Sequence, residues 1–204
     1  FDTKDESGNN IWYTTPDNLI AGTKNKTDQK YTFIRYFPHL KAFKGKTDAP
    51  YNKMTITQMQ KDKDGFYLIY TKEQLETFCN IVNNTLTSDE VKNNYIENIS
   101  VKGKLMNDID LKGDKNNQWT PIGNSTRNYT GVFDGNFYKI SGLYIDNTSD
   151  YQGLFGYVDK KGTVRNLGVD GTVKGRNNVG SVAGYKYGTV NNCYNMGNIS
   201  GNDN

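Results

Sequence analysis

Short runs of alternating apolar and polar residues dominate the last third of the chain. Single apolar positions, such as Val164, Leu167, Val169 and Val173, stand between polar ones, and glycine recurs where a run ends. This alternation is typical of short β-strands, because successive side chains of a strand point to opposite faces. Strands this short cannot bury an apolar face alone, so we expect them to stack on one another.

The runs also repeat at a fixed distance. Residues 162–167 read GTVRNL and residues 188–193 read GTVNNC, an offset of 26, and residues 171–175 match residues 197–201 at the same offset. A fixed period with variable loops is typical of a solenoid, whereas a propeller blade needs about 40 residues. The repeat therefore predicts successive coils of a parallel β-helix.

Two details refine this repeat. Gly156-Tyr157 matches Gly184-Tyr185 at an offset of 28, which indicates a small loop insertion between the two units. Asn166 and Asn192 occupy equivalent positions. Coils stacked about 4.8 Å apart would place these side chains one above the other, so we expect an asparagine ladder.

One helix is predicted, over about residues 72–83. Thr71 and Gln74 form a capping box before it, and four residues fall on one face of the helix: Leu75, Phe78, Cys79 and Val82. A charged turn at 61–65 and a strand at 66–70 precede it. A polar loop follows the helix, and no further helix is expected from residue 95 onward.

The first 64 residues carry weaker signals. Residues 31–37 and 53–59 have strand composition, and prolines punctuate this part of the chain. We interpret residues 1–64 as a small β-rich N-terminal module or the end of a preceding domain. Residues 65–204 are then the β-helix with its N-terminal capping helix.

Composition agrees with a mainly β fold and excludes some partners. Hydrophobic residues make up 34% of 204 residues, but tyrosine and phenylalanine are plentiful, which argues against disorder. The 25 basic and 22 acidic residues are scattered, so a nucleic-acid partner is not expected. No apolar run approaches the roughly 20 residues of a membrane span. Cys79 and Cys193 could form one disulfide, although burial as two free thiols is the favoured interpretation.

Five motifs in order give the chain a resemblance to a known family. They are LMNDIDL at 105–111, WTPIG at 119–123, FDGN at 133–136, ISGL at 140–143 and GLFG at 153–156. Residues 65–204 thereby resemble the GLUG-motif proteins. The resemblance implies a right-handed parallel β-helix in large secreted or cell-surface bacterial proteins with adhesin-like roles.

The chain departs from the family pattern at two turns. Residues 134–137 read DGNF where the family has glycine in the fourth place, so an aromatic residue stands where glycine permits positive φ. We expect this turn to be altered. Residues 180–184 read GSVAG in place of a glycine pair, a change that the small serine can accommodate.

Candidate catalytic groups are the carboxylates of Asp108 with Asp110, of Asp134, and of Asp146 with Asp150. Parallel β-helices can host polysaccharide lyases that use such groups, but outer-face and turn positions account for them more simply. No calcium-loop motif is present, and His39 is the single histidine. We therefore predict no enzyme activity, no cofactor and no metal site.

Binding residues are expected among the tyrosines of the repeat. Tyr185 and Tyr187 are two apart and would face one side of an extended segment, and Tyr157 is the counterpart of Tyr185 one coil earlier. Exposed aromatic rings with polar neighbours suit sugars. Packing of these rings against neighbouring loops remains an equally good interpretation.

The leading hypothesis is a secreted or cell-surface bacterial module, adhesin-like, that recognises a host glycan or matrix protein. The alternatives are an accessory domain of a secreted carbohydrate-active enzyme or protease, and a stalk without a ligand. Beyond Gly201 no helix and no charged run covers the last coil. Because an open β-helix end is an unpaired edge, we expect further repeats or self-association through it.

Overall fold

The computed structural model describes residues 59–92 and 95–201, together with four short strands nearer the N-terminus. The chain forms two compact units, Phe1–Met54 and Thr55–Asn204. In the first unit, the described strands make two antiparallel pairs: β1 (Thr3–Lys4) with β2 (Asn10–Ile11), and β3 (Gly22–Lys24) with β4 (Tyr31–Phe33). The predicted strand at 53–59 lies, except for Met59, outside the described residues, as does His39.

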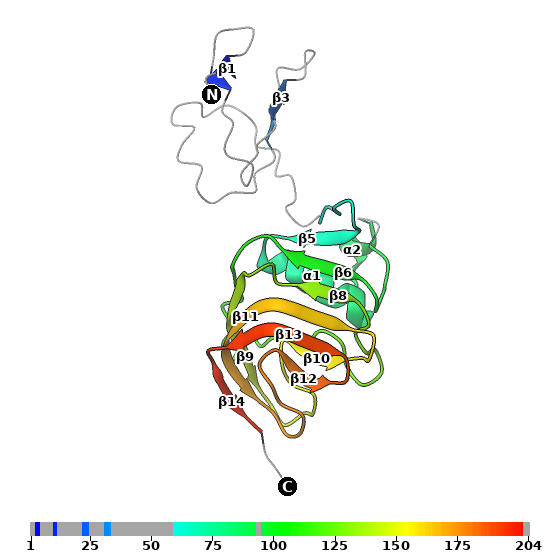
Figure 1. Cartoon of the computed structure of the whole chain (residues 1–204), viewed down its shortest axis with the longest axis vertical. Coiled ribbons are helices and arrows are strands. Elements are labelled where there is room, and N and C mark those ends of the chain that lie inside the picture. The colour runs from blue at the N-terminus through cyan, green and yellow to red at the C-terminus, as the bar shows by residue number, and fades with distance from the viewer. Residues whose placement is uncertain are drawn as a thin grey trace. The chain divides into compact units, whose positions relative to one another are not determined.

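The second unit is a parallel β-solenoid of about four turns (Figure 1). Its largest sheet stacks strands from successive coils in parallel register. The strands of this sheet are β5 (Phe66–Ile69), β6 (Lys102–Leu105), β7 (Ile109–Asp110), β8 (Val132–Asp134), β9 (Lys139–Asp146), β11 (Thr163–Lys174), β13 (Thr189–Asn195) and β14 (Asn198–Ser200). The predicted fold class is therefore confirmed.

The register between coils follows the sequence repeat. Val164 of β11 pairs with Val190 of β13, which is the predicted offset of 26. The asparagine ladder is also present, because Nδ2 of Asn192 donates to Oδ1 of Asn166 at 2.7 Å. Both asparagines have positive φ, 54° and 50°, a conformation that asparagine tolerates better than most residues.

A second, smaller stack closes the solenoid on its other side. It consists of β10 (Phe155–Val158) and β12 (Ala183–Lys186), which pair in parallel, and a bridge from Ile122 to Phe155 extends it by one coil. Helix α1 (Lys72–Asn83) continues this stack: Nδ2 of Asn83 donates to the carbonyl of Pro121 at 2.9 Å. The helix thus takes the place of a strand at the N-terminal end of the solenoid.

The predicted helix is present, together with a second helix that was not predicted. Helix α1 has the predicted bounds, and Oγ1 of Thr71 accepts from the Gln74 N–H at 3.3 Å. A second helix, α2 (Ser88–Lys92), occupies part of the segment predicted as a polar loop. A capping box explains it: the Glu90 N–H donates to Thr87 Oγ1, and the Thr87 N–H donates to Glu90 Oε2. Among the described residues, no helix is long and apolar enough to cross a membrane.

Four aromatic rings join the helix to both stacks. The ring of Phe78 on α1 lies 5.5 Å from that of Phe133 and 6.1 Å from that of Tyr129, and both of these lie 5.2 Å from Phe155. All four side chains are fully buried. Burying a side chain of this size contributes roughly 1.5–3 kcal/mol, so this cluster is a major source of stability. The buried Tyr129 hydroxyl donates a hydrogen bond to the carbonyl of Val101 at 2.9 Å.

The turn at 134–137 keeps its form, contrary to the predicted alteration. Asn136 and Phe137 both have positive φ, 50° and 65°, and the Tyr138 N–H donates to the Gly135 carbonyl at 2.8 Å. These values define a type I′ turn, in which glycine is preferred at the position of Phe137. The backbone is retained because Asp134 holds it, accepting from the Asn136 N–H at 2.8 Å. The Phe137 side chain is 78% exposed and gains little from burial.

Phe137→Gly should therefore stabilise the protein. The left-handed conformation costs a bulky residue about 1 kcal/mol, which glycine does not pay, and little buried surface is lost. Thermal unfolding should show a rise in Tm of about 2–4 °C. A lower Tm would mean that the exposed ring makes a stabilising contact and that the turn carries no strain.

Candidate functional site

Two of the three predicted tyrosines stack on each other across neighbouring coils. Tyr157 of β10 is the register partner of Tyr185 of β12, and their ring centroids are 4.6 Å apart at 37°. Tyr185 is 37% exposed. Tyr187, just beyond β12, is 62% exposed, and no ring contact involves it within the described part of the chain. The structure thus brings Tyr157 and Tyr185 together and leaves Tyr187 outside this pair.

A third ring completes the cluster, and sequence reasoning missed it. Tyr151 lies 5.8 Å from Tyr157 and 6.0 Å from Tyr185, measured between ring centroids. Its backbone has φ of 60°, an unusual conformation for an aromatic residue, and its N–H donates to the carbonyl of Asn177 at 3.0 Å. Strained backbone of this kind often occurs at binding sites. We call Tyr151, Tyr157 and Tyr185 the tyrosine face.

Glycines beneath the tyrosine face allow this close stacking. A Cβ at position 156 would lie 2.4 Å from the carbonyl oxygen of Gly123, and one at position 184 would lie 2.5 Å from that of Asn178. Neither contact is possible for a residue with a side chain. The repeated Gly-Tyr pair therefore combines close coil packing with a ring on the outer surface.

Polar and charged groups surround the rings. Next to Tyr151, Arg176 donates from Nε and Nη2 to the two carboxylate oxygens of Asp150 at 2.8 and 2.9 Å. Partial burial raises the pKa of Tyr157, and nearby Tyr185 and Asp159 raise it further. The tyrosine face is thus an apolar surface bordered by hydrogen-bonding groups.

The carboxylates considered for catalysis all hold turns or neighbouring coils. Asp108 accepts from the Lys139 N–H at 2.8 Å and Asp110 from the Lys112 N–H at 2.9 Å. Asp146 pairs with Lys174 at 3.2 Å. Between residues 59 and 201, outside the short undescribed segment at 93–94, no three His, Cys, Asp or Glu side chains gather as a metal site would require.

Asp134 is a buried carboxylate that accepts hydrogen bonds from three residues. Arg165 Nε donates to its Oδ2 at 2.9 Å, and Asn166 Nδ2 donates to its Oδ1 at 3.0 Å. Burial raises the pKa of Asp134, but these hydrogen bonds and that of the Asn136 N–H outweigh it and hold the pKa below the ordinary value of 3.8. Asp134 thus begins the ladder that continues through Asn166 to Asn192.

Comparisons with known proteins match part of the chain. No family model and no solved structure matches it. A stretch of 79 residues, 36% of the chain, is 40% identical to a "Gly-rich membrane protein" of Evansella cellulosilytica and covers 9% of that protein. A stretch of 88 residues, 41% of the chain, is 40% identical to "Halomucin" of Haloquadratum walsbyi and covers 1% of it. The chain therefore spans only a small part of these relatives.

Stability should fall at acid pH through Asp134. Because its pKa is lower in the folded than in the unfolded state, its contribution is present above the unfolded value and is lost as pH falls below about 4. Asp134→Asn should cost about 1.5–3 kcal/mol at pH 7, the usual contribution of hydrogen bonds to a charged group. The difference from the parent protein should shrink as pH approaches the folded pKa.

Thermal unfolding of both proteins between neutral and acid pH measures this effect. Asp146→Asn is the matched control, since its ion pair with Lys174 is exposed on both sides and should contribute about 0–1 kcal/mol. A constant difference between Asp134→Asn and the parent protein at every pH would show that ionisation of Asp134 does not stabilise the fold.

Proposed function

We propose that this chain is a binding module of a secreted or cell-surface bacterial protein, in which a rigid β-solenoid presents the tyrosine face to a glycan. The observation that carries the proposal is the in-register stack of Tyr157 on Tyr185, with Tyr151 beside both. The resemblance to GLUG-motif proteins supports the adhesin-like role and remains a prediction. No catalytic step is part of this proposal.

The chemistry of the tyrosine face suits a carbohydrate. Tyrosine combines an apolar ring, on which the C–H face of a sugar can lie, with a hydroxyl that can hydrogen-bond to it. Because neighbouring coils are about 4.8 Å apart, the rings follow one another along the solenoid axis and can contact successive units of a linear glycan. Asp159, whose charge raises the pKa of Tyr157, lies near the rings and can accept hydrogen bonds from sugar hydroxyls.

The names of the two relatives that match part of the chain support a surface location. One is called a membrane protein, and the name of the other, Halomucin, refers to a mucin.

A stalk without a ligand is the second candidate. It is favoured by the ladder of Asp134, Asn166 and Asn192, which stiffens the solenoid without forming a pocket. Whether the tyrosine face binds a ligand distinguishes the glycan-binding module from the stalk.

A glycan array with the intact chain, followed by titration of the best oligosaccharide, tests the proposal. Tyr185→Ala should weaken binding about tenfold or more, as the loss of a central aromatic contact does. Tyr187→Ala should have a smaller effect, because its ring stands outside the stack. Phe137→Gly, which removes an exposed ring on a different turn, is the control and should bind like the parent protein.

Two results would contradict the glycan proposal. One is the absence of binding to any oligosaccharide, which would favour the stalk. The other is binding that Tyr185→Ala leaves unchanged while its Tm equals that of the parent protein, which would place the site elsewhere.

A further inference from the structure

Left-handed backbone recurs where the chain turns, and asparagine is the residue that most often adopts it. Among the described residues, the asparagines with positive φ are Asn84, Asn136, Asn166, Asn178 and Asn192. Asparagine takes this conformation at a lower cost than most other residues with a side chain. The remaining cases apart from glycine are Lys112, Phe137 and Tyr151. Tyr151 therefore departs from the residue preference of these turns.

The next coil shows that the turn at Tyr151 does not require an aromatic residue. A parallel bridge joins Gln152 to Val179. Asn178 is therefore the register counterpart of Tyr151, and its φ of 55° is close to the 60° of Tyr151. The Gln152 N–H donates to the carbonyl of Asn178 at 3.0 Å, which ties the two turns together. The left-handed conformation thus belongs to the stacked turns, whichever side chain they carry.

Close backbone packing holds Tyr151 in this conformation. A Cβ at position 184 would lie 2.7 Å from the carbonyl carbon of Tyr151, and one at position 156 would lie 3.0 Å from its carbonyl oxygen. Gly156 and Gly184 directly precede Tyr157 and Tyr185, so the backbone of Tyr151 lies against both strands that carry the other two rings. Strained residues persist where their surroundings fix them, and they cluster at binding sites.

The ring of Tyr151 has a different orientation from the other two rings of the tyrosine face. It makes an angle of 84° with the ring of Tyr185, whereas the rings of Tyr157 and Tyr185 are inclined by only 37°. Tyr151 is half-buried, so part of its ring is open to solvent. A ligand on the tyrosine face can therefore meet rings of two orientations, which Tyr157 and Tyr185 alone would not provide.

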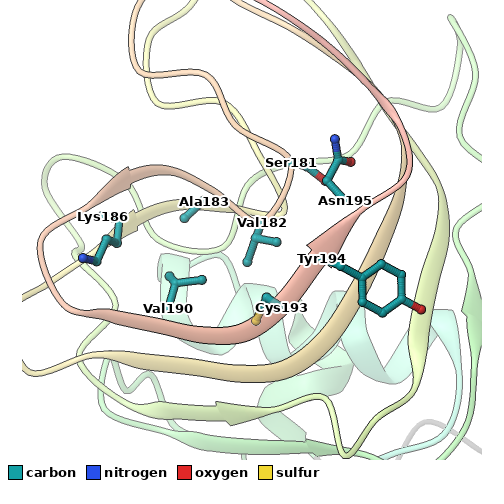
Figure 2. A pocket seen from close by; sticks show the side chains of 8 residues that line it. All are labelled: Ser181, Val182, Ala183, Lys186, Val190, Cys193, Tyr194 and Asn195. Atoms are coloured by element: carbon teal, nitrogen blue, oxygen red, sulfur yellow. The ribbon is translucent and has the colours of Figure 1, made fainter.

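The tyrosine face is separate from the pocket beside it in the sequence. Figure 2 shows this pocket of about 360 Å³ between β12 and β13, and its lining includes Val182, Val190 and the free thiol of Cys193 but none of the three tyrosines. A ligand of the tyrosine face is thus selected by the arrangement of the rings and not by the shape of this pocket.

We propose that Tyr151 determines which sugars the tyrosine face accepts, an inference that rests on the glycan-binding function proposed above. Its ring approaches the sugar from a second side and leaves no room for a hydroxyl that points toward it. Specificity of this kind needs a repulsive contact with the wrong ligand as well as attraction to the right one. Contact with Tyr185 supplies the affinity, and Tyr151 discriminates between sugars that differ in the configuration of one hydroxyl.

Titration with epimeric oligosaccharides tests the proposal. The ligands are the best oligosaccharide from the glycan array and its epimers, each with one hydroxyl inverted. At least one epimer should bind the parent chain about tenfold or more weakly than the best ligand, within the range that small changes of a ligand produce. In Tyr151→Asn this ratio should fall to about one, because the rejected epimer binds more tightly than it binds the parent chain.

Control variants separate specificity from folding. Tyr151→Phe keeps the ring and should keep the preference of the parent chain. Tyr151→Asn carries the residue of the equivalent turn one coil later, so its Tm should lie within about 4 °C of the parent value. Tyr185→Ala should weaken binding of the best ligand and of its epimers by similar factors, because it removes affinity and leaves the discriminating ring in place.

Four outcomes would overturn the role of Tyr151. Two of them leave the glycan-binding function standing: an unchanged preference among epimers in Tyr151→Asn, or an equal weakening of all ligands, which would mean that the ring contributes affinity alone. A much larger fall in Tm for Tyr151→Asn than for Tyr151→Phe would show that the ring is retained for packing. Absence of binding of the parent chain to any oligosaccharide would overturn both proposals together.

Discussion

The structure depends on the stacking of each coil in register on the coil before it. A parallel strand that forms no hairpin must satisfy its backbone hydrogen bonds on neighbouring coils, so every coil provides the edge that the next one needs. The Thr163 N–H donates to the Gly131 carbonyl and the Thr189 N–H to the Gly162 carbonyl, each at 2.9 Å. Inward side chains then form columns, such as Phe133, Val164 and Val190.

The same constraint produces the surface features. Because equivalent residues lie one above another, Tyr157 and Tyr185 become a stack, and Asp134, Asn166 and Asn192 become a ladder. The side of the solenoid presents the tyrosine face. Within the described residues, the last coil leaves Ile199 38% exposed, although its register partner Val173 is buried.

Sequence reasoning succeeded where the signal was periodic or local. The 26-residue offset predicted the pairing of β11 with β13, and the Thr71 cap predicted the start of α1. It failed where three-dimensional proximity was needed: Tyr151 joins the tyrosine face through a left-handed backbone that no motif marks. The short helix α2 was missed although Thr87 and Glu90 form a capping box, because five residues give no apolar periodicity. Phe137 adopts a left-handed conformation that residue preference alone would not predict, next to Asn136, whose N–H donates to Asp134.

Residue-resolved hydrogen exchange tests the central claim, that the coils form one cooperative stack. If they do, the amides of β8 and β11, which are bonded between coils, should exchange slowly and in step with those of α1, through global unfolding. Exchange at the Thr163 and Phe155 amides as fast as in the exposed loop at 124–127 would contradict it, because the coils would then open independently and could not hold the tyrosine face in register.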